Sequence, residues 1–299
     1  MTNIFTGGSF DDYYLALVKD LINTGERSSN RTGIDTLYKL GLYMEIDMQK
    51  GFPLLTTKRI AWKAAFGEML GFIRGYTNAS QFRELGCRVW DQNANENIDW
   101  LNNIYRIGTD DLGLIYGYQW RNWKKIDTFI KDLSHVDQLK NVYIDLKNNI
   151  DNRREIVTAW NPGELHKMAL PPCHMTMQFG LRENNSVLDL FLYVRSNDIG
   201  LGMPFNVAQY SWLLHLMAKI TGHMPGKLLY YAFNYHIYEN HIESLMTQLS
   251  RDCKQSPIIE INEIVDSFDF LENTNLPIDQ WTFIHNYDPH PLIKMTMAV

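Results

Sequence analysis

Hydrophobic positions recur at helical spacing in several stretches of the chain. Residues 10–24 carry apolar side chains three and four positions apart, which predicts an amphipathic helix ended by a following glycine. Residues 60–74 predict a long apolar helix, and residues 206–221 are apolar nearly all round, as in a buried helix that stops at Gly222. A further amphipathic helix is predicted over residues 136–150.

Other stretches have the pattern of β-strands. Residues 34–48 alternate loosely between apolar and polar, residues 187–194 are largely apolar, as in a buried strand, and residues 156–160 form a shorter candidate. Residues 92–110 are polar and rich in asparagine, which predicts a surface insertion or lid. Since no repeat or linker interrupts this mixture, we expect an α+β fold in a single domain, residues 1–299.

Composition narrows the class of protein. The chain has 299 residues, 45% of them hydrophobic, which is enough for a large core, and its net charge of -6 gives no general attraction to nucleic acid or anionic membranes. No apolar stretch reaches the ~20 residues that span a bilayer, and no signal peptide is visible. Three sparse cysteines do not form a disulfide framework, so a reducing cytoplasm is expected. His236 and His241 have metal-ligand spacing but lack a third partner, so no metal is expected.

Cys173 has the local sequence of a candidate nucleophile. Pro171 and Pro172 precede it, and because they fix the backbone and remove two N–H donors, they present its side chain from a defined place. His174 and nearby arginines could lower the pKa of the thiol and supply thiolate. Most free cysteines are small buried hydrophobes, so these residues alone leave both interpretations open.

Four arginines stand in polar or turn-like contexts: Arg31, Arg153, Arg154 and Arg195. A planar guanidinium suits bidentate recognition of phosphate, and a chain with negative net charge needs such local concentration to bind an anion. Most arginines are simply solvated at the surface. A phosphate site and ordinary solvation therefore both remain possible.

Short strings along the chain, taken in order, closely resemble the thymidylate synthase family. They cover nearly the whole chain from about Phe10 and include Asn30-Arg-Thr-Gly33, Glu68-Met-Leu70, Ala159-Trp-Asn-Pro162, Met168-Ala-Leu-Pro-Pro-Cys-His174 and Met297-Ala-Val299. The resemblance implies a large mixed β-sheet flanked by helices, with one sheet face forming the interface of a homodimer. It also implies reductive methylation of deoxyuridylate (dUMP) with methylenetetrahydrofolate as the co-substrate.

The same resemblance implies catalytic roles for four residues. Cys173 adds to carbon 6 of the pyrimidine, and Glu68 organises proton transfer through water near the pyrimidine carbonyl. Tyr116 lies near the carbon 5 proton that is abstracted, although a core aromatic is the simpler interpretation without the family. Asn206 reads the pyrimidine edge, because an amide can accept from N3–H and donate to O4 of uracil.

Binding roles follow by resemblance as well. The residues that bind the phosphate are Arg31, Arg195 and Ser196, together with Arg153 and Arg154 donated from the partner subunit. The residues that hold the ribose 3′-hydroxyl are His236 and Tyr238. The residues facing the folate are Trp90, Asp198, Leu201, Gly202 and Phe205, with Asp198 also facing the nucleotide. The C-terminal segment that ends at Val299 closes over the co-substrate and excludes water.

The chain departs from the family pattern near these residues. Gly71 replaces a tryptophan, which leaves a cavity or lets another side chain fill the space, and Tyr76 and Val194 replace polar family residues. These departures keep open a dUMP hydroxymethylase, in which water captures the intermediate in place of hydride; Trp90 and the complete terminus weigh against it.

A third hypothesis is a protein that binds RNA without catalysis, but the chain has no aromatic-basic RNA motif.

Overall fold

The architecture is a mixed β-sheet with helices packed on one side. A computed structural model describes residues 3–30, 33–127, 132–150 and 153–296. The main sheet has the strand order β1-β3-β9-β8-β7-β6, with β2 pairing with β3. Its strands are β1 (Asn3–Phe5), β2 (Glu26–Ser28), β3 (Thr36–Asp47), β6 (Ile156–Thr158), β7 (His174–Arg182), β8 (Val187–Asp198) and β9 (Met224–Tyr238).

The remaining elements surround this sheet. Two small antiparallel pairs are β4 (Trp123–Asp127) with β5 (Asp132–Val136) and β10 (Ile258–Ile261) with β11 (Thr282–His285). The helices are α1 (Phe10–Thr24), α2 (Trp62–Ile73), α3 (Ala79–Glu84), α4 (Asp91–Asn95), α5 (Ile98–Leu101), α6 (Tyr116–Arg121), α7 (Gln138–Lys147), α8 (Gly202–Thr221), α9 (Ile242–Leu249) and α10 (Phe268–Asn273).

Strand directions make the sheet mixed. β8 and β9 are parallel and are joined by the crossover helix α8, whereas β3–β9, β7–β8 and β6–β7 are antiparallel. The expected single α+β domain with a mixed sheet and flanking helices is therefore confirmed.

The predicted helices are present, with small shifts at their ends. α1 has the predicted bounds because a Ser9–Asp12 capping box starts it, and α2 and α7 lie within the predicted ranges. α8 begins four residues earlier than predicted, at Gly202, and ends where Gly222 adopts a left-handed conformation with φ 82°. β8 continues beyond the predicted residue 194 to Asp198, which carries it into the site described below.

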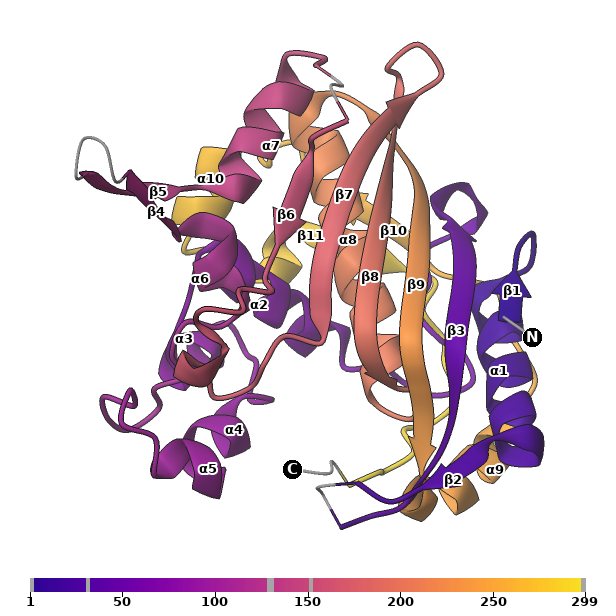
Figure 1. Ribbon diagram of the computed structural model, residues 1–299. Coiled ribbons are helices and arrows are strands. Elements are labelled where there is room, and N and C mark those ends of the chain that lie inside the picture. Colours follow the sequence, from indigo (N-terminus) through magenta and orange to yellow (C-terminus); the bar gives the residue numbers. More distant parts are fainter. Residues whose placement is uncertain (1–2, 31–32, 128–131, 151–152, 297–299) are drawn as a thin grey trace.

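The core lies between the sheet and helices α2 and α8. α8 lies behind the sheet in Figure 1 and is buried on nearly all sides, as its apolar sequence predicts. Phe66 of α2 stacks on Trp212 of α8 with ring centroids 4.4 Å apart, and Trp212 in turn stacks on Trp281 at 5.5 Å. This packing holds α2, which carries Glu68, at a fixed place relative to α8.

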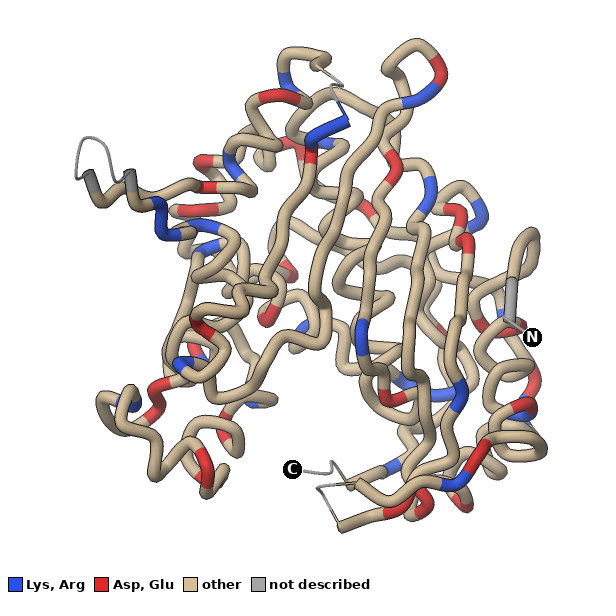
Figure 2. Tube along the Cα trace, in the orientation of Figure 1, with Lys and Arg blue, Asp and Glu red and all other residues tan. Residues whose placement is uncertain are grey.

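The opposite face of the sheet is apolar and carries no helix among the described residues. Phe191 and Phe233 are exposed on it, and Tyr193 of β8 lies against Tyr231 of β9 with centroids 5.5 Å apart. Figure 2 shows few charged residues along these central strands. We call this surface, defined by Phe191, Tyr193, Tyr231 and Phe233, the open sheet face.

Residues 91–110 form α4, α5 and the turns after them. Trp100 is buried, and its indole N–H donates to the carbonyl of Asp111 at 2.7 Å, while the Asn97 amide donates to the carbonyl of Ala169 at 3.0 Å. Ile104 and Ile107 project outward and are 88% and 90% exposed. One side of the segment is thus anchored to the body of the domain, and the other faces solvent.

Phe82 of α3 fills the space beside Gly71. A Cβ atom added at Gly71 would lie 2.6 Å from Phe82 Cδ1, closer than real carbon atoms approach. Phe82 is fully buried and contacts Phe72 edge-on at 5.7 Å. The departure at residue 71 therefore leaves no cavity, because the ring of Phe82 occupies the room of the missing side chain.

Gly71→Ala should destabilise the fold, by about 1–3 kcal/mol, because the added methyl group forces the Phe82 ring out of a packed position. Urea denaturation would measure the free energy of unfolding of Gly71→Ala, Phe82→Leu and the double variant. We expect the alanine to cost less in the Phe82→Leu background. If Gly71→Ala instead stabilised the protein by the ~0.5–1 kcal/mol that alanine usually adds in a helix, the proposed clash would be wrong.

Candidate active site

The parallel pairing of β8 and β9 gathers polar side chains at one end of the sheet. In this register Ser196 pairs with Asn234 and Asp198 with His236, and the amide of Ile199 donates to the carbonyl of His236 at 2.8 Å. Both strands therefore end together, at the edge where open α/β sheets commonly bind ligands.

Cys173 reaches the same edge from the other direction. It immediately precedes β7, which runs antiparallel to β8, so the start of β7 lies beside the end of β8. The amide of Arg195 donates to the Cys173 carbonyl at 2.9 Å, and the amide of Cys173 donates to the hydroxyl of Tyr116 at 2.7 Å. The strand register is irregular between His174 and Thr176, a distortion often found beside active sites.

The guanidinium of Arg195 is held by the two prolines before Cys173. Its Nε donates to the carbonyl of Pro172 and its Nη2 to that of Pro171, both at 2.9 Å. The group also lies over the ring of Trp160, 5.5 Å from the centroid. A fixed positive charge thus stands next to Cys173, as the sequence predicts.

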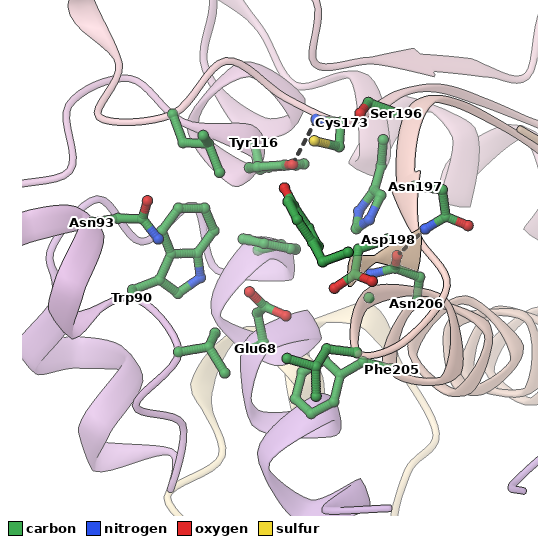
Figure 3. A pocket seen from close by; sticks show the side chains of 17 residues that line it. Glu68, Trp90, Asn93, Tyr116, Cys173, Ser196, Asn197, Asp198, Phe205 and Asn206 are labelled. Carbon is green, nitrogen blue, oxygen red and sulfur yellow. Dashed lines mark hydrogen bonds between the residues drawn. The ribbon is translucent and has the colours of Figure 1, made fainter. Parts of the chain in front are cut away.

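Two cavities of about 390 Å³ each meet at Cys173. They share Leu170, Cys173, Ser196, Asp198 and Tyr238. The first continues between the walls shown in Figure 3, formed by Glu68, Trp90, Tyr116, Leu201, Gly202, Phe205 and Asn206. The second continues past Ser28, Asn30, Arg195 and His236. Cys173 therefore stands between a largely apolar chamber and a more polar one.

Glu68 is buried in the first chamber. Burial raises the pKa of its carboxyl group to about 7, while the Gln209 amide and the nearby Trp90 indole oppose the rise. Gln209 Nε2 hydrogen-bonds the carboxylate, whereas the buried Trp90 N–H lies beside it without completing a hydrogen bond. A carboxyl group with this pKa can both accept and release a proton near neutral pH.

His174 behaves differently from the prediction. Burial lowers the pKa of its imidazole to about 4, so the ring is neutral near pH 7. The idea that a charged His174 activates the thiol of Cys173 is therefore wrong, because the apolar wall around the ring disfavours its cation. Arg195 remains as the positive charge beside Cys173 in the described part of the site.

Asn206 is held by a neighbour that sequence reasoning missed. The Nδ2 of Asn197 donates to Asn206 Oδ1 at 3.1 Å, and the hydroxyl of Tyr230 donates to Asn197 Oδ1 at 2.8 Å. Asn93 also lines the first chamber, beside Trp90 (Figure 3). Neither asparagine carries a signal in the sequence, apart from the position of Asn197 between two site residues.

The structure brings most of the predicted site residues together. Those lining one or both chambers are Glu68, Trp90, Tyr116, Cys173, Arg195, Ser196, Asp198, Leu201, Gly202, Phe205, Asn206, His236 and Tyr238. Arg153 and Arg154 are exposed just before β6, and neither chamber includes them. Arg31 and Val299 lie outside the described residues.

The described residues contain neither a metal-binding cluster nor a helix that could span a membrane. Among the described residues, no three His, Cys, Asp or Glu side chains are placed so that they could hold a metal ion. In the same part of the chain, no helix combines the length and the apolar character that crossing a bilayer requires.

Comparison with known proteins agrees with this arrangement. The model of the family described as thymidylate synthase matches residues 12–299. A thymidylate synthase of Idiomarina loihiensis is 43% identical over 289 residues, covering 96% of this chain and 99% of its own. The chain belongs to the thymidylate synthase family. A thymidylate synthase of Pseudomonas putida is 40% identical over 323 residues, with 96% and 99% covered.

The family also includes fused proteins. A bifunctional dihydrofolate reductase-thymidylate synthase of Zea mays is 40% identical over 291 residues, covering 96% of this chain and 54% of the relative. Within the thymidylate synthase family, this chain thus matches complete single-function relatives and about half of the fused one.

The buried carboxyl group of Glu68 should make stability depend on pH. Its pKa is raised from 4.5 to about 7 in the folded state, so folding is disfavoured as pH rises between these values. The penalty is absent below about 4.5 and complete above about 7, and it amounts to roughly 3 kcal/mol. Relative to wild type, Glu68→Gln should therefore gain stability between pH 5 and pH 8.

Chemical denaturation at a series of pH values would measure this difference. Exposed Glu243 provides the matched control, since Glu243→Gln removes a carboxylate that is not buried. A stability difference between Glu68→Gln and wild type that stays constant from pH 5 to pH 8 would contradict the raised pKa.

Proposed function

We propose that the chain is a thymidylate synthase that converts dUMP to thymidylate through a covalent bond between Cys173 and the pyrimidine. The observation that carries the proposal is the position of Cys173 at the junction of two chambers. One chamber has the apolar walls and few polar groups that suit a pyrimidine and a pterin, and the other has a fixed guanidinium. A thiol at their junction faces the base of a nucleotide whose phosphate lies toward Arg195.

Cys173 acts as the nucleophile in this proposal. Carbon 6 of uracil is a Michael acceptor, because the electron pair of the C5–C6 bond can move toward the carbonyl at carbon 4. The thiolate sulfur forms the bond to carbon 6, and carbon 5 becomes nucleophilic. Asn206 supports the developing negative charge by donating a hydrogen bond to O4, and its Oδ1 accepts from N3–H.

Glu68 exchanges protons in this proposal, and Tyr116 acts as a hydrogen-bonding group. Glu68 lies in the same chamber and, with a pKa of about 7, exchanges protons with water near O4. The hydroxyl of Tyr116 accepts from the Cys173 amide, which supports the proposed role of its oxygen near carbon 5 of a bound pyrimidine. Burial raises the pKa of Tyr116 far above its ordinary value, so the hydroxyl keeps its proton and acts by hydrogen bonding.

The first chamber also fits the reduced folate. Trp90, Leu201 and Phe205 offer apolar surface for a flat ring, while Asp198 and Asn93 offer polar contacts at its rim. Methylenetetrahydrofolate, when bound, supplies the one-carbon unit and the hydride. The residues of this chain orient it and exclude water, and the segment that ends at Val299 is proposed to close the chamber.

The second chamber is proposed to hold the deoxyribose phosphate. Arg195 and Ser196 contact the phosphate together with Arg31, and His236 and Tyr238 contact the 3′-hydroxyl. His236 is oriented by a 2.8 Å hydrogen bond between its Nδ1 and the Asn234 side chain.

The active form is proposed to be a homodimer joined through the open sheet face. An exposed apolar surface on the central strands of a sheet is expected to be covered by a partner. Arg153 and Arg154 lie outside both chambers of their own chain, and their proposed role is to contact the partner's phosphate site across such an interface. We place the protein in the reducing cytoplasm, because Cys87, Cys173 and Cys253 form no disulfide bond.

The alternatives have less support. The relatives compared above are named thymidylate synthases, and Phe82 fills the space at Gly71 that had kept a hydroxymethylase open. Figure 2 shows Lys and Arg interleaved with Asp and Glu along the described chain, and with a net charge of -6 this gives no support to RNA binding.

One assay tests the proposed function. Purified protein with dUMP and methylenetetrahydrofolate should generate the absorbance of dihydrofolate, and mass analysis should find a methylated nucleotide. Cys173→Ser should lower turnover by at least ~10³-fold and still bind dUMP, because only the nucleophile is lost. Cys253→Ser, which alters an exposed thiol, is the matched control and should keep full activity.

Other results would each exclude part of the proposal. A nucleotide heavier by a hydroxymethyl group, formed without dihydrofolate, would assign the hydroxymethylase. Turnover that survives in Cys173→Ser would exclude the covalent mechanism.

Replacing Phe191 by Glu should dissociate the homodimer. A carboxylate on the open sheet face would have to be buried against its own symmetry mate, at a cost of several kcal/mol. Light scattering would measure the mass, and turnover should fall with it because the partner's arginines are lost. Ile107→Glu places the same charge on a highly exposed isoleucine elsewhere and should leave the dimer intact. A wild-type protein that is monomeric and fully active would exclude the interface.

A further inference from the structure

Gln209 of α8 connects two residues of the site directly. Its Nε2 hydrogen-bonds the carboxylate of Glu68 and donates to the carbonyl of Ala65 at 3.2 Å, while its Oε1 accepts from Asn206 Nδ2 at 3.4 Å. The side chain is fully buried. A buried amide in an apolar core is costly unless it is paired, and here two of its three partners are site residues.

These bonds form one continuous chain across the floor of the site. It runs from β9 to α2 in the order Tyr230, Asn197, Asn206, Gln209 and Glu68. Burial raises the pKa of Tyr230 and keeps its proton, and its hydroxyl donates to Asn197 Oδ1. Every amide that follows must then present oxygen toward Tyr230 and nitrogen toward Glu68.

The far end of the chain imposes the same order. The Ala65 carbonyl and the Glu68 carboxylate are acceptors, so they select the NH₂ group of Gln209 and turn its oxygen toward Asn206. A flipped Asn206 would place its oxygen against Gln209 Oε1 and its nitrogen against Asn197 Nδ2. The flip is therefore unfavourable, because it would leave two buried polar contacts without a hydrogen bond.

From this arrangement, and on the basis of the proposed function, we propose that Gln209 is a positioning residue that fixes the amide of Asn206 for uracil and holds the carboxylate of Glu68. In the fixed orientation, Asn206 keeps one N–H and one lone pair for the ligand. These match O4 and N3–H of uracil, whereas cytosine offers a donor at N4 and an acceptor at N3 and would need the flipped amide.

The two actions of Gln209 can be separated by substitution. Gln209→Met keeps the volume but removes both the acceptor for Asn206 and the donor to Glu68. Gln209→Glu keeps an oxygen that accepts from Asn206 but brings a second carboxyl group to Glu68. The first variant should alter nucleotide choice and proton exchange, and the second should alter only proton exchange.

Three ionisable groups that face Glu68 do not titrate near neutral pH. They are Tyr116 on α6, Tyr210 on α8 and Cys87 after α3, and burial raises the pKa of each well above neutrality. The Trp90 indole beside the carboxylate does not titrate. Cys173 is the other group whose ionisation the proposed mechanism uses, so a limb of the pH profile is assigned to Glu68 when it is absent from Glu68→Gln.

The experiment compares wild type with Gln209→Met, Gln209→Glu and Gln248→Met. Gln248 is the matched control, because it is also fully buried but donates to Thr57 Oγ1, away from both chambers. Calorimetry would measure the Kd of dUMP and of dCMP without the folate, and steady-state assays would measure kcat/KM from pH 5.5 to 9. Thermal melts would confirm that each variant folds.

In Gln209→Met we expect about tenfold weaker dUMP binding, a smaller preference for dUMP over dCMP, and a shift of the Glu68-dependent limb to higher pH by about one unit. The shift is upward because a lost donor disfavours the carboxylate. In Gln209→Glu the limb should also move upward, because like charges disfavour ionisation, while the preference for dUMP persists. Gln248→Met should change neither.

A Gln209→Met protein with the wild-type nucleotide preference and pH limb would overturn the inference, as would changes confined to the melting temperature. If Gln209→Met does not fold, Gln209→Leu, which also lacks the donor and the acceptor, takes its place with the same expected changes. A wild-type protein that binds dUMP but forms no thymidylate would refute the proposed function, and the nucleotide preference of the variants would still test Gln209.

Discussion

The parallel pairing of β8 with β9 is the constraint on which the site depends. Two parallel strands need a crossover, and α8 provides it, so the first turns of α8 rise from the same sheet end at which Asp198 and His236 pair. Antiparallel β7 then brings Cys173 to that end. A slip of one residue in β8 would exchange the faces of its side chains and separate Ser196 from the site. The residues of the site therefore come together only when these strands pair in this register.

Burial sets the electrostatics around this sheet end. The same apolar walls raise the pKa of Glu68 to about 7 and lower that of His174 to about 4, so both groups favour their neutral forms. The positive charge is left to Arg195, which the carbonyls of Pro171 and Pro172 hold in place. A largely apolar chamber beside a fixed cation suits a ligand with a neutral base and an anionic phosphate, and this division follows from packing rather than from any single residue.

The spacing of apolar residues along the sequence predicted the helices better than the strands. α1, α2 and α8 have caps or long apolar faces, which are local signals, but β7 and the 15-residue β9 were not predicted as elements. β9 is apolar on both faces, since Leu229 and Tyr231 on the open sheet face alternate with Leu228 and Tyr230 in the core, and this hides the period of two. The site residues were found through family resemblance. Their convergence depends on strand register, which joins residues far apart in sequence and leaves no local signal.

Two of the departures from the family pattern, Gly71 and Tyr76, belong to one packed cluster of aromatic rings. Phe82 occupies the space beside Gly71, Tyr76 packs edge-on against Phe82 at 6.0 Å, and Phe82 also lies 6.1 Å from Trp90. Phe72 continues the contacts by stacking on Tyr116 at 4.7 Å. A change at residue 71 is thus transmitted through rings to the wall of the first chamber, where it can adjust the position of Trp90. The change at residue 71 opens no path for water, because the rings remain in contact. The substitutions at residues 71 and 76 are therefore compatible with hydride transfer as the last step.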